Sequence, residues 1–253
     1  MNLKEAEKEF EIFAKKYDLD YPKMKRKYEH SIRVMKNAGK IAESLNLNKD
    51  EIELSKLIGL LHDIGHFETI KRNDILKENI KIDHGDLGVE ILQKNSYIRK
   101  FIQEEKYDSI ILKAIKNHNK FKIEEGLSEK QLLFAKIIRD ADKLDIFFEG
   151  AEIFWTKREQ IDEINNSTVS NEIFNDFKNN CLLDIKNIKT KLDGIISFIG
   201  QMYDINFKYD FEVIKKEDYI NKILNRFNIQ DKKTSSQISE VRTILTEYIE
   251  KQL

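Results

Sequence analysis

The stretch Leu60-Leu61-His62-Asp63-Ile64-Gly65-His66 decides how the rest of the chain is interpreted. It closes an apolar run that begins at Ile52 and repeats with helical spacing. An imidazole and a carboxylate are costly to bury side by side unless a partner satisfies them. We predict a helix over about Lys49–Ile64 that ends at Gly65, since glycine suits a left-handed helix terminus. The pair therefore predicts a polar site in the core.

All five histidines of the chain lie between residues 30 and 118. Three fall on inward faces of predicted helices and one opens a further helix: His30, His62, His118 and His84. A single inward histidine is more often a hydrogen-bonded core residue than a ligand. Four on separate helices would each need a buried partner, whereas one metal ion, or a pair, would satisfy them together. We therefore expect a metal site held by a helical frame.

The chain contains few of the proline and glycine residues that form the tight turns between strands. Pro22 is the only proline, and there are nine glycines in 253 residues. Strands joined by tight turns usually need more, and long helices need none, so we expect an all-α fold. Helices are predicted over about 3–17, 23–45, 49–64, from 83, from 108, over 129–148, and near 171–203, 216–227 and 236–252. We expect a loop with a short helix over Phe67–Ile82, and Ile205–Val213 is ambiguous because it also resembles a strand.

No low-complexity linker divides the chain. We therefore predict that residues 1–150 form the helical metal-binding domain and that residues 151–253 form a helical extension packed on the same core. The aromatic-rich segment Phe198–Phe211 either lines a pocket mouth or packs in the core.

Composition excludes some classes of partner. Lys and Arg (44) nearly balance Asp and Glu (45), so no general attraction to nucleic acid or anionic membranes follows. Cys181 is the only cysteine, which excludes an intrachain disulfide and agrees with a reducing compartment. No run approaches the roughly 18 apolar residues that span a bilayer, and the N-terminus lacks the apolar core of a signal peptide. We expect a cytoplasmic protein without a membrane partner, and a homodimer is left open.

Two motifs resemble the metal signature of the HD superfamily of phosphohydrolases. His30, the pair His62-Asp63, and Asp142 in Ile-Arg-Asp-Ala-Asp-Lys-Leu-Asp match its ligand pattern, and His84 and His118 resemble the additional histidines of its two-metal members. The motifs cover about residues 24–148. The resemblance implies an HD-domain helical bundle with additional C-terminal helices.

The resemblance also implies a ligand set. The first ion would be bound by His30, His62, Asp63 and Asp142, and Asp63 would bridge to a second ion held by His84 and His118. Asp140 is the alternative to Asp142 as the aspartate ligand, because it also shares a helix face with apolar residues. In the family pattern the ligand follows an alanine, which favours Asp142. Donor sets rich in nitrogen and oxygen favour one or two ions of iron, manganese, cobalt, nickel or zinc over magnesium.

Besides Asp63, three residues are predicted to take part in catalysis. His66 lies where some two-metal relatives carry Lys or Arg, and two roles stay open. It could act as a general acid near neutral pH, or it could cap the end of the helix or form a hydrogen bond directed outward. Arg33, one turn after His30, and Lys143 are the cations that we expect to meet a substrate anion. In a chain with 44 basic residues, a solvated charge is the more usual role. Asn119 is a candidate hydrogen-bonding residue of the site.

The leading functional hypothesis is a metal-dependent phosphohydrolase that cleaves a nucleotide or another small phosphate ester with a metal-activated water. The superfamily also contains di-iron oxygenases with a similar ligand set, which is the first alternative. The second alternative is a sensor or scaffold that binds metal without catalysis.

Overall fold

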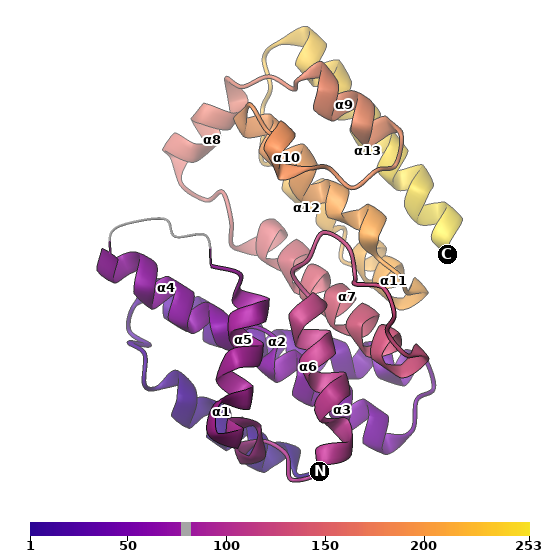
Figure 1. Cartoon of the computed structure of the whole chain (residues 1–253). Helices are drawn as coiled ribbons and strands as arrows, with labels where there is room; N and C mark the ends of the chain where they lie inside the picture. Colours follow the sequence, from indigo (N-terminus) through magenta and orange to yellow (C-terminus); the bar gives the residue numbers. More distant parts are fainter. Residues whose placement is uncertain (77–81) are drawn as a thin grey trace. The chain divides into compact units, whose positions relative to one another are not determined.

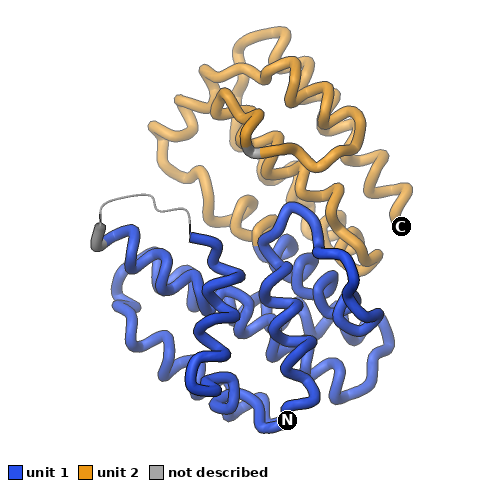
Figure 2. The backbone as a smooth tube through the Cα atoms, viewed as in Figure 1, with its two compact units in different colours: residues 1–145 blue, residues 146–253 orange. Residues whose placement is uncertain are grey.

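The computed structural model describes residues 1–76 and 82–253, and all regular structure in this part of the chain is helical. The all-α prediction is therefore confirmed (Figure 1). The chain divides into two compact units, Met1–Asp145 (unit 1) and Ile146–Leu253 (unit 2), coloured separately in Figure 2. The predicted division after residue 150 lies close to this boundary. Packing of the C-terminal part on the same core stays a prediction.

Unit 1 contains all five histidines. Its helices are α1 Leu3–Ala14, α2 Pro22–Ser44, α3 Lys49–Leu61, α4 Ile64–Leu76, α5 His84–Gln93, the 3₁₀ segments η1 Lys94–Lys100 and η2 Glu105–Tyr107, α6 Asp108–Asn117, and α7 Glu129–Glu152, which continues into unit 2. Local signals set several boundaries. Pro22 occupies the first turn of α2, and Asn48 with Glu51 forms a capping box at the start of α3.

The sequence suggested that the His62-Asp63 pair lies inside a helix, but the structure places it between two helices. The helix α3 ends at Leu61 and α4 begins at Ile64, so the pair forms the corner between them. The backbone N–H of His66 donates to the carbonyl of Asp63 at 2.8 Å and closes this corner. The predicted helix end at Gly65 is therefore wrong, and the corner lets neighbouring side chains turn toward the same interior.

Gly65 is required for close packing rather than for a left-handed conformation. A Cβ atom at this position would lie 2.2 Å from the carbonyl oxygen of His84 and 2.6 Å from the nitrogen of Gly88. Both atoms belong to the backbone, which cannot move aside as a flexible side chain can. The glycine pair thus lets α4 and α5 approach closely and brings His84 beside the corner.

The prediction of a loop with a short helix over Phe67–Ile82 underestimates the helix in its described part, because α4 runs to Leu76; residues 77–81 lie outside the described residues. Phe67 is fully buried and packs against Phe10, Phe13 and Tyr17 with ring centroids 5.5–5.9 Å apart. This aromatic cluster holds α4 against α1. Sequence periodicity missed the helix because its buried face carries few apolar side chains.

Unit 2 is a second set of shorter helices. They are α8 Arg158–Asn165, α9 Asn171–Lys178, η3 Ile185–Asn187, α10 Lys191–Gly200, η4 Gln201–Asp204, α11 Lys208–Lys216, α12 Tyr219–Leu224 and α13 Lys232–Gln252. The predicted helical stretch near 171–203 is interrupted between α9 and α10. The strand-like Ile205–Val213 is resolved as the approach to α11 and most of that helix, with Phe211 buried.

Candidate metal centre

Four helices of unit 1 and the corner between two others bring the predicted ligands together. His30 comes from α2, the His62-Asp63 pair from the α3–α4 corner, and Asp142 from α7. His84 opens α5, and His118 follows the last residue of α6. His30, His62, Asp63 and His118 are at most 5% exposed. The six predicted ligands thus meet within one buried group.

The first set of donor atoms surrounds the Nε2 atom of His30. It lies 3.2 Å from His62 Nε2, 3.1 Å from Asp142 Oδ1 and 3.5 Å from Asp63 Oδ2. His62 Nε2 lies 3.5 Å from Asp63 Oδ2 and 3.8 Å from Asp142 Oδ1. Two imidazole nitrogens and one oxygen of Asp63 therefore form one donor group, and Asp142 lies beside its two histidines.

The second set uses the other oxygen of Asp63. The Nε2 atoms of His84 and His118 lie 3.1 Å apart, and each lies 3.5 Å from Asp63 Oδ1. One carboxylate therefore presents Oδ2 to the first histidine pair and Oδ1 to the second. This is the geometry of a bridging ligand.

The donor spacing fits metal coordination. Ligand bonds of about 2.1 Å place adjacent donors of one ion about 3.0–3.4 Å apart in octahedral or tetrahedral geometry. The separations among His30, His62 and Asp63 are 3.2–3.5 Å, and those among Asp63, His84 and His118 are 3.1–3.5 Å. The residues present therefore fit coordination of divalent metal.

Backbone carbonyls fix the orientation of two ligand rings. The Nδ1 atom of His62 lies 2.8 Å from the carbonyl of Gly59, and Nδ1 of His118 lies 2.7 Å from the carbonyl of Ile115. A carbonyl only accepts, so Nδ1 carries the proton in both rings. The Nε2 lone pair of each neutral ring is then directed at the site, as metal binding requires.

His30 is oriented by a carboxylate instead. Its Nδ1 atom lies 2.6 Å from Asp145 Oδ2, and Asp145 also accepts from Arg33, with Nε at 2.6 Å and a terminal nitrogen at 3.0 Å. Arg33, predicted to meet a substrate anion, is therefore paired with a buried acid behind the ligand. Burial alone would lower the pKa of His30, but hydrogen bonds to Asp142 and Asp145 outweigh it and raise this pKa to about 9.

Lys27 is the site residue that the sequence analysis missed. Its ammonium lies 2.7 Å from Asp63 Oδ2, and its side chain is 16% exposed. Burial would raise the pKa of Asp63, but Lys27 and the nearby histidines hold it well below its usual range. The available signal was spacing: Lys27 precedes His30 by three residues and shares its helix face.

His66 lies at the edge of the site. Its ring stacks on His84 with centroids 4.6 Å apart, and its Nδ1 lies 3.6 Å from Asp63 Oδ2. Nδ1 is buried without a hydrogen-bond partner among the described residues. His66 therefore faces the ligand cluster rather than turning outward, and its proposed role as an acid stays a prediction.

Helix geometry separates the two candidate aspartates of α7. Residues two apart on a helix point about 200° apart, so Asp140 and Asp142 face nearly opposite sides. Asp142 is the one within 3.1 Å of His30. Lys143, predicted to meet substrate, is only 6% exposed, and its ammonium lies 3.4 Å from the carbonyl of Arg139.

The turn that follows His118 is secured to α5 and α7. Asn119 donates to Asp83 at 3.0 Å, and its Nδ2 lies 3.4 Å from His84 Nδ1. Arg139 donates to the carbonyl oxygens of Asn117 at 2.9 Å and Lys120 at 2.5 Å. Asn119 thus lies at the site, as expected, while Arg139 restrains the segment that carries His118.

Burial controls the protonation of two further ligands. It lowers the pKa of His62 to about 4 and that of His84 to about 3, in spite of the opposing charge of Asp63. Both rings are therefore neutral at neutral pH, which is the form that binds metal.

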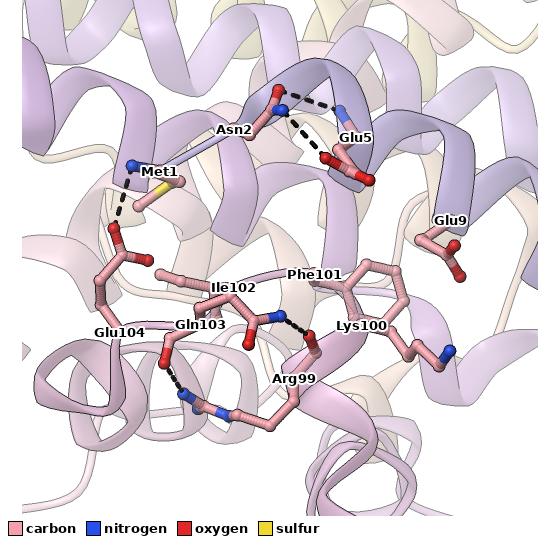
Figure 3. A pocket seen from close by; sticks show the side chains of 10 residues that line it. All are labelled: Met1, Asn2, Glu5, Glu9, Arg99, Lys100, Phe101, Ile102, Gln103 and Glu104. Atoms are coloured by element: carbon pink, nitrogen blue, oxygen red, sulfur yellow. Dashed lines mark hydrogen bonds and ion pairs between the residues drawn. The ribbon is translucent and has the colours of Figure 1, made fainter.

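A separate pocket of unit 1 lies between α1 and the η1–η2 region (Figure 3). It has a volume of about 540 Å³ and contains an ion pair between the N-terminal amine and Glu104. Its lining includes none of the predicted ligands. The chemistry of the histidine cluster therefore does not extend to this pocket.

These features define a class: an all-α domain built around a paired histidine–aspartate metal centre. Residues 28–146, somewhat less than half of the chain, match the family model of the HD domain, which confirms the resemblance for this part of the chain. HD domains bind divalent metals and are mostly metal-dependent hydrolases. Comparisons with curated proteins and with solved structures found no match.

Proposed function

We propose that this protein is a metal-dependent phosphohydrolase that acts on a nucleotide or another small phosphate ester. One observation carries the proposal: the two oxygens of Asp63 face two separate histidine pairs, each at 3.5 Å. A structural core does not require a carboxylate shared between two nitrogen-rich donor sets. Such a carboxylate suits a pair of transition-metal ions. Iron, manganese, cobalt, nickel and zinc are the candidate ions.

Divalent ions held there would acidify a water and neutralise phosphoryl oxygens. The residues of the chain perform the remaining tasks. His62 and His118 keep their Nε2 atoms directed inward through their backbone hydrogen bonds. Asp145 and Arg33 hold His30 from behind. The buried frame thus fixes the donor atoms before substrate binds.

Two side chains support a phosphate ester as the substrate class. Lys27 brings a positive charge to the edge of the cluster, and it is partly exposed. His66, 30% exposed, has an imidazole that can give a proton to a leaving oxygen. A cation and a proton donor beside a two-metal site suit hydrolysis of a phosphate ester, in which negative charge develops on oxygen.

The decisive experiment combines metal analysis with a substrate screen. The purified chain, loaded separately with manganese and with iron, is incubated with nucleotides, cyclic nucleotides and dinucleotides, and phosphate release and product mass are measured. We expect two ions per chain and release from at least one substrate. The Asp63→Ala variant should release none, whereas Asp74→Ala, which alters an exposed carboxylate of α4, should match the parent.

Other outcomes would redirect the proposal. Substrate-dependent oxygen uptake without phosphate release would identify the di-iron oxygenase alternative. Bound metal without activity on any substrate would favour the sensor or scaffold, and absence of bound metal with no activity after metal addition would contradict the proposal.

The remaining expectations stay part of the proposal. No described helix is long and apolar enough to cross a membrane. A cytoplasmic location, the absence of a nucleic-acid partner and a homodimer await direct measurement.

A further inference from the structure

The structural reasons that account for glycine at the other eight positions do not apply to Gly194. Seven of the nine glycines would place a Cβ within 3.4 Å of another atom, and Gly126 has a φ of +79°. Gly194 lies inside α10, has no left-handed φ, and its Cβ would meet nothing within 4 Å among the described residues. Glycine weakens a helix interior relative to alanine. Neither packing nor backbone conformation accounts for its presence here.

The space beside Gly194 is a pocket of unit 2. It has a volume of about 330 Å³ and is formed by α8, α10 and the segment before α8. Its apolar side chains include Trp155, Phe198, Ile164 and Ile195, of which the two isoleucines are at most 4% exposed. A side chain at Gly194 would project into this space. The glycine therefore keeps the pocket open.

An aromatic pair forms one wall. Trp155 and Phe198 meet edge to face, with centroids 5.0 Å apart. Trp155 has a φ of +51°, which is costly for a bulky residue. Phe154 and Phe227 pack around its indole at 5.7 Å and 6.1 Å. The cluster thus holds a strained tryptophan at a pocket rather than letting it pack in the core.

The rim of the pocket is polar. Gln160 supplies an amide that both donates and accepts, and Lys191 and Glu163 form an exposed ion pair at 3.4 Å. Aromatic rings below a rim with donors and acceptors suit a flat ring whose edge carries both kinds of group. A purely apolar ligand would make no use of the Gln160 amide, whereas the edge of such a ring can pair with it.

We propose that this pocket of unit 2 binds the base of a nucleoside or a similar planar heterocycle, at a site separate from the metal centre. Aromatic contact with Trp155 and Phe198 supplies most of the binding, and the amide of Gln160 meets the edge of the ring. The proposal does not depend on the phosphohydrolase activity, because a nucleoside carries no phosphate.

The chain offers its own reporter for the test, because Trp155 is its only tryptophan. Adenosine, guanosine, cytidine and uridine are titrated into the metal-free full-length protein. Indole fluorescence is excited where nucleobases do not absorb, and equilibrium dialysis measures binding independently. We expect a saturable fluorescence change and matching dialysis binding for at least one nucleoside, and none with ribose.

Two substitutions at one position make the test specific. Gly194→Leu fills the pocket and should weaken nucleoside binding at least tenfold, while circular dichroism stays unchanged. Gly194→Ala is the matched control: it should raise the melting temperature, because alanine favours the helix, and keep binding within a few-fold.

Three results would overturn the proposal. These are no binding of any nucleoside in either assay, equal binding by the Gly194→Leu variant, or a parent dimer that this variant dissociates in sedimentation. The last result would mean that a second copy of the chain occupies the pocket.

Discussion

Asp63 in unit 1 and Asp193 in unit 2 are the same residue type with the same burial, at 2% and 0% exposed, but their partners differ. Asp193 accepts from three backbone N–H groups, those of Ser170, Lys189 and Thr190, at 2.8–3.1 Å. Asp63 instead faces the side chains of Lys27 and of five histidines. Both carboxylates are paired, but only one is surrounded by groups that bind metal.

The comparison separates two uses of a buried acid. Backbone donors at Asp193 tie the start of α10 to the loops around it, so this acid supports the fold. At Asp63, the Nδ1 atoms of His30, His62 and His118 are fixed by hydrogen bonds, and their Nε2 atoms point into the cluster. Burial alone therefore does not identify a functional acid; the identity and orientation of its partners do.

Removing Asp63 should have the largest effect. Asp63→Ala deletes the oxygen shared by both donor sets, so we expect loss of both ions and of phosphate release. His84→Ala deletes a donor of the second set alone and should retain one ion. Metal content measured by mass spectrometry distinguishes these cases. Retention of both ions and full activity in the two variants would show that the ligand assignment is wrong.

Removing Asp193 should damage stability instead. Asp193→Ala leaves three backbone donors without their acceptor, and we expect a loss of about 3 kcal/mol in the free energy of unfolding. Asp193→Asn keeps one acceptor oxygen and should lose less. Urea denaturation gives the free energy, and metal content should equal that of the parent. If the folded Asp193→Ala variant lost its metal, Asp193 would also support the metal site, and the proposed difference between the two acids would be wrong.

The pH should control the first ion through His30. Burial lowers the pKa of His30, but Asp142 and Asp145 raise it to about 9, so the metal-free ring is protonated at neutral pH. Metal requires the neutral ring. Affinity for the first ion should therefore rise about tenfold per pH unit as the pH increases toward 9.

Calorimetric titrations at several pH values test this dependence. Asp145→Asn removes one source of the raised pKa of His30 and should flatten the slope between pH 7 and 9. A constant affinity in the parent protein over that range would contradict the assigned role of His30.

The smallest expected effect concerns Lys27. Its ammonium lies 2.7 Å from an oxygen of Asp63 that faces the first donor set, so it opposes a cation there. Lys27→Met should raise metal affinity roughly fivefold, because a competing charge is removed. Lys27→Arg retains the charge and is the control. Unchanged or weaker metal binding by Lys27→Met would show that Lys27 does not compete for Asp63.

The helical class was predicted from local features of the sequence, whereas the six candidate ligands that the structure brings together were implied by the resemblance to the HD superfamily. Helical periodicity is visible along the chain, and histidine and aspartate are uncommon on buried faces. The corner at His62-Asp63 was missed because an apolar run shows no sign of where two helices meet. The aromatic segment Phe198–Phe211 had two predicted roles, and both occur: Phe198 lines a pocket, whereas Phe211 is buried.

The sequence by itself determined that the chain is helical and which side chains have the chemistry to bind metal, because helix spacing and side-chain chemistry are properties of neighbouring residues. Only the tertiary structure decided which oxygen of Asp63 faces which histidine pair, that Lys27 joins the site, and that Arg33 pairs with Asp145. These contacts join residues 32 to 112 positions apart. Packing brings together residues that are this far apart in the sequence. At Gly65, the absence of a Cβ atom lets the backbone of α4 contact the backbone of α5.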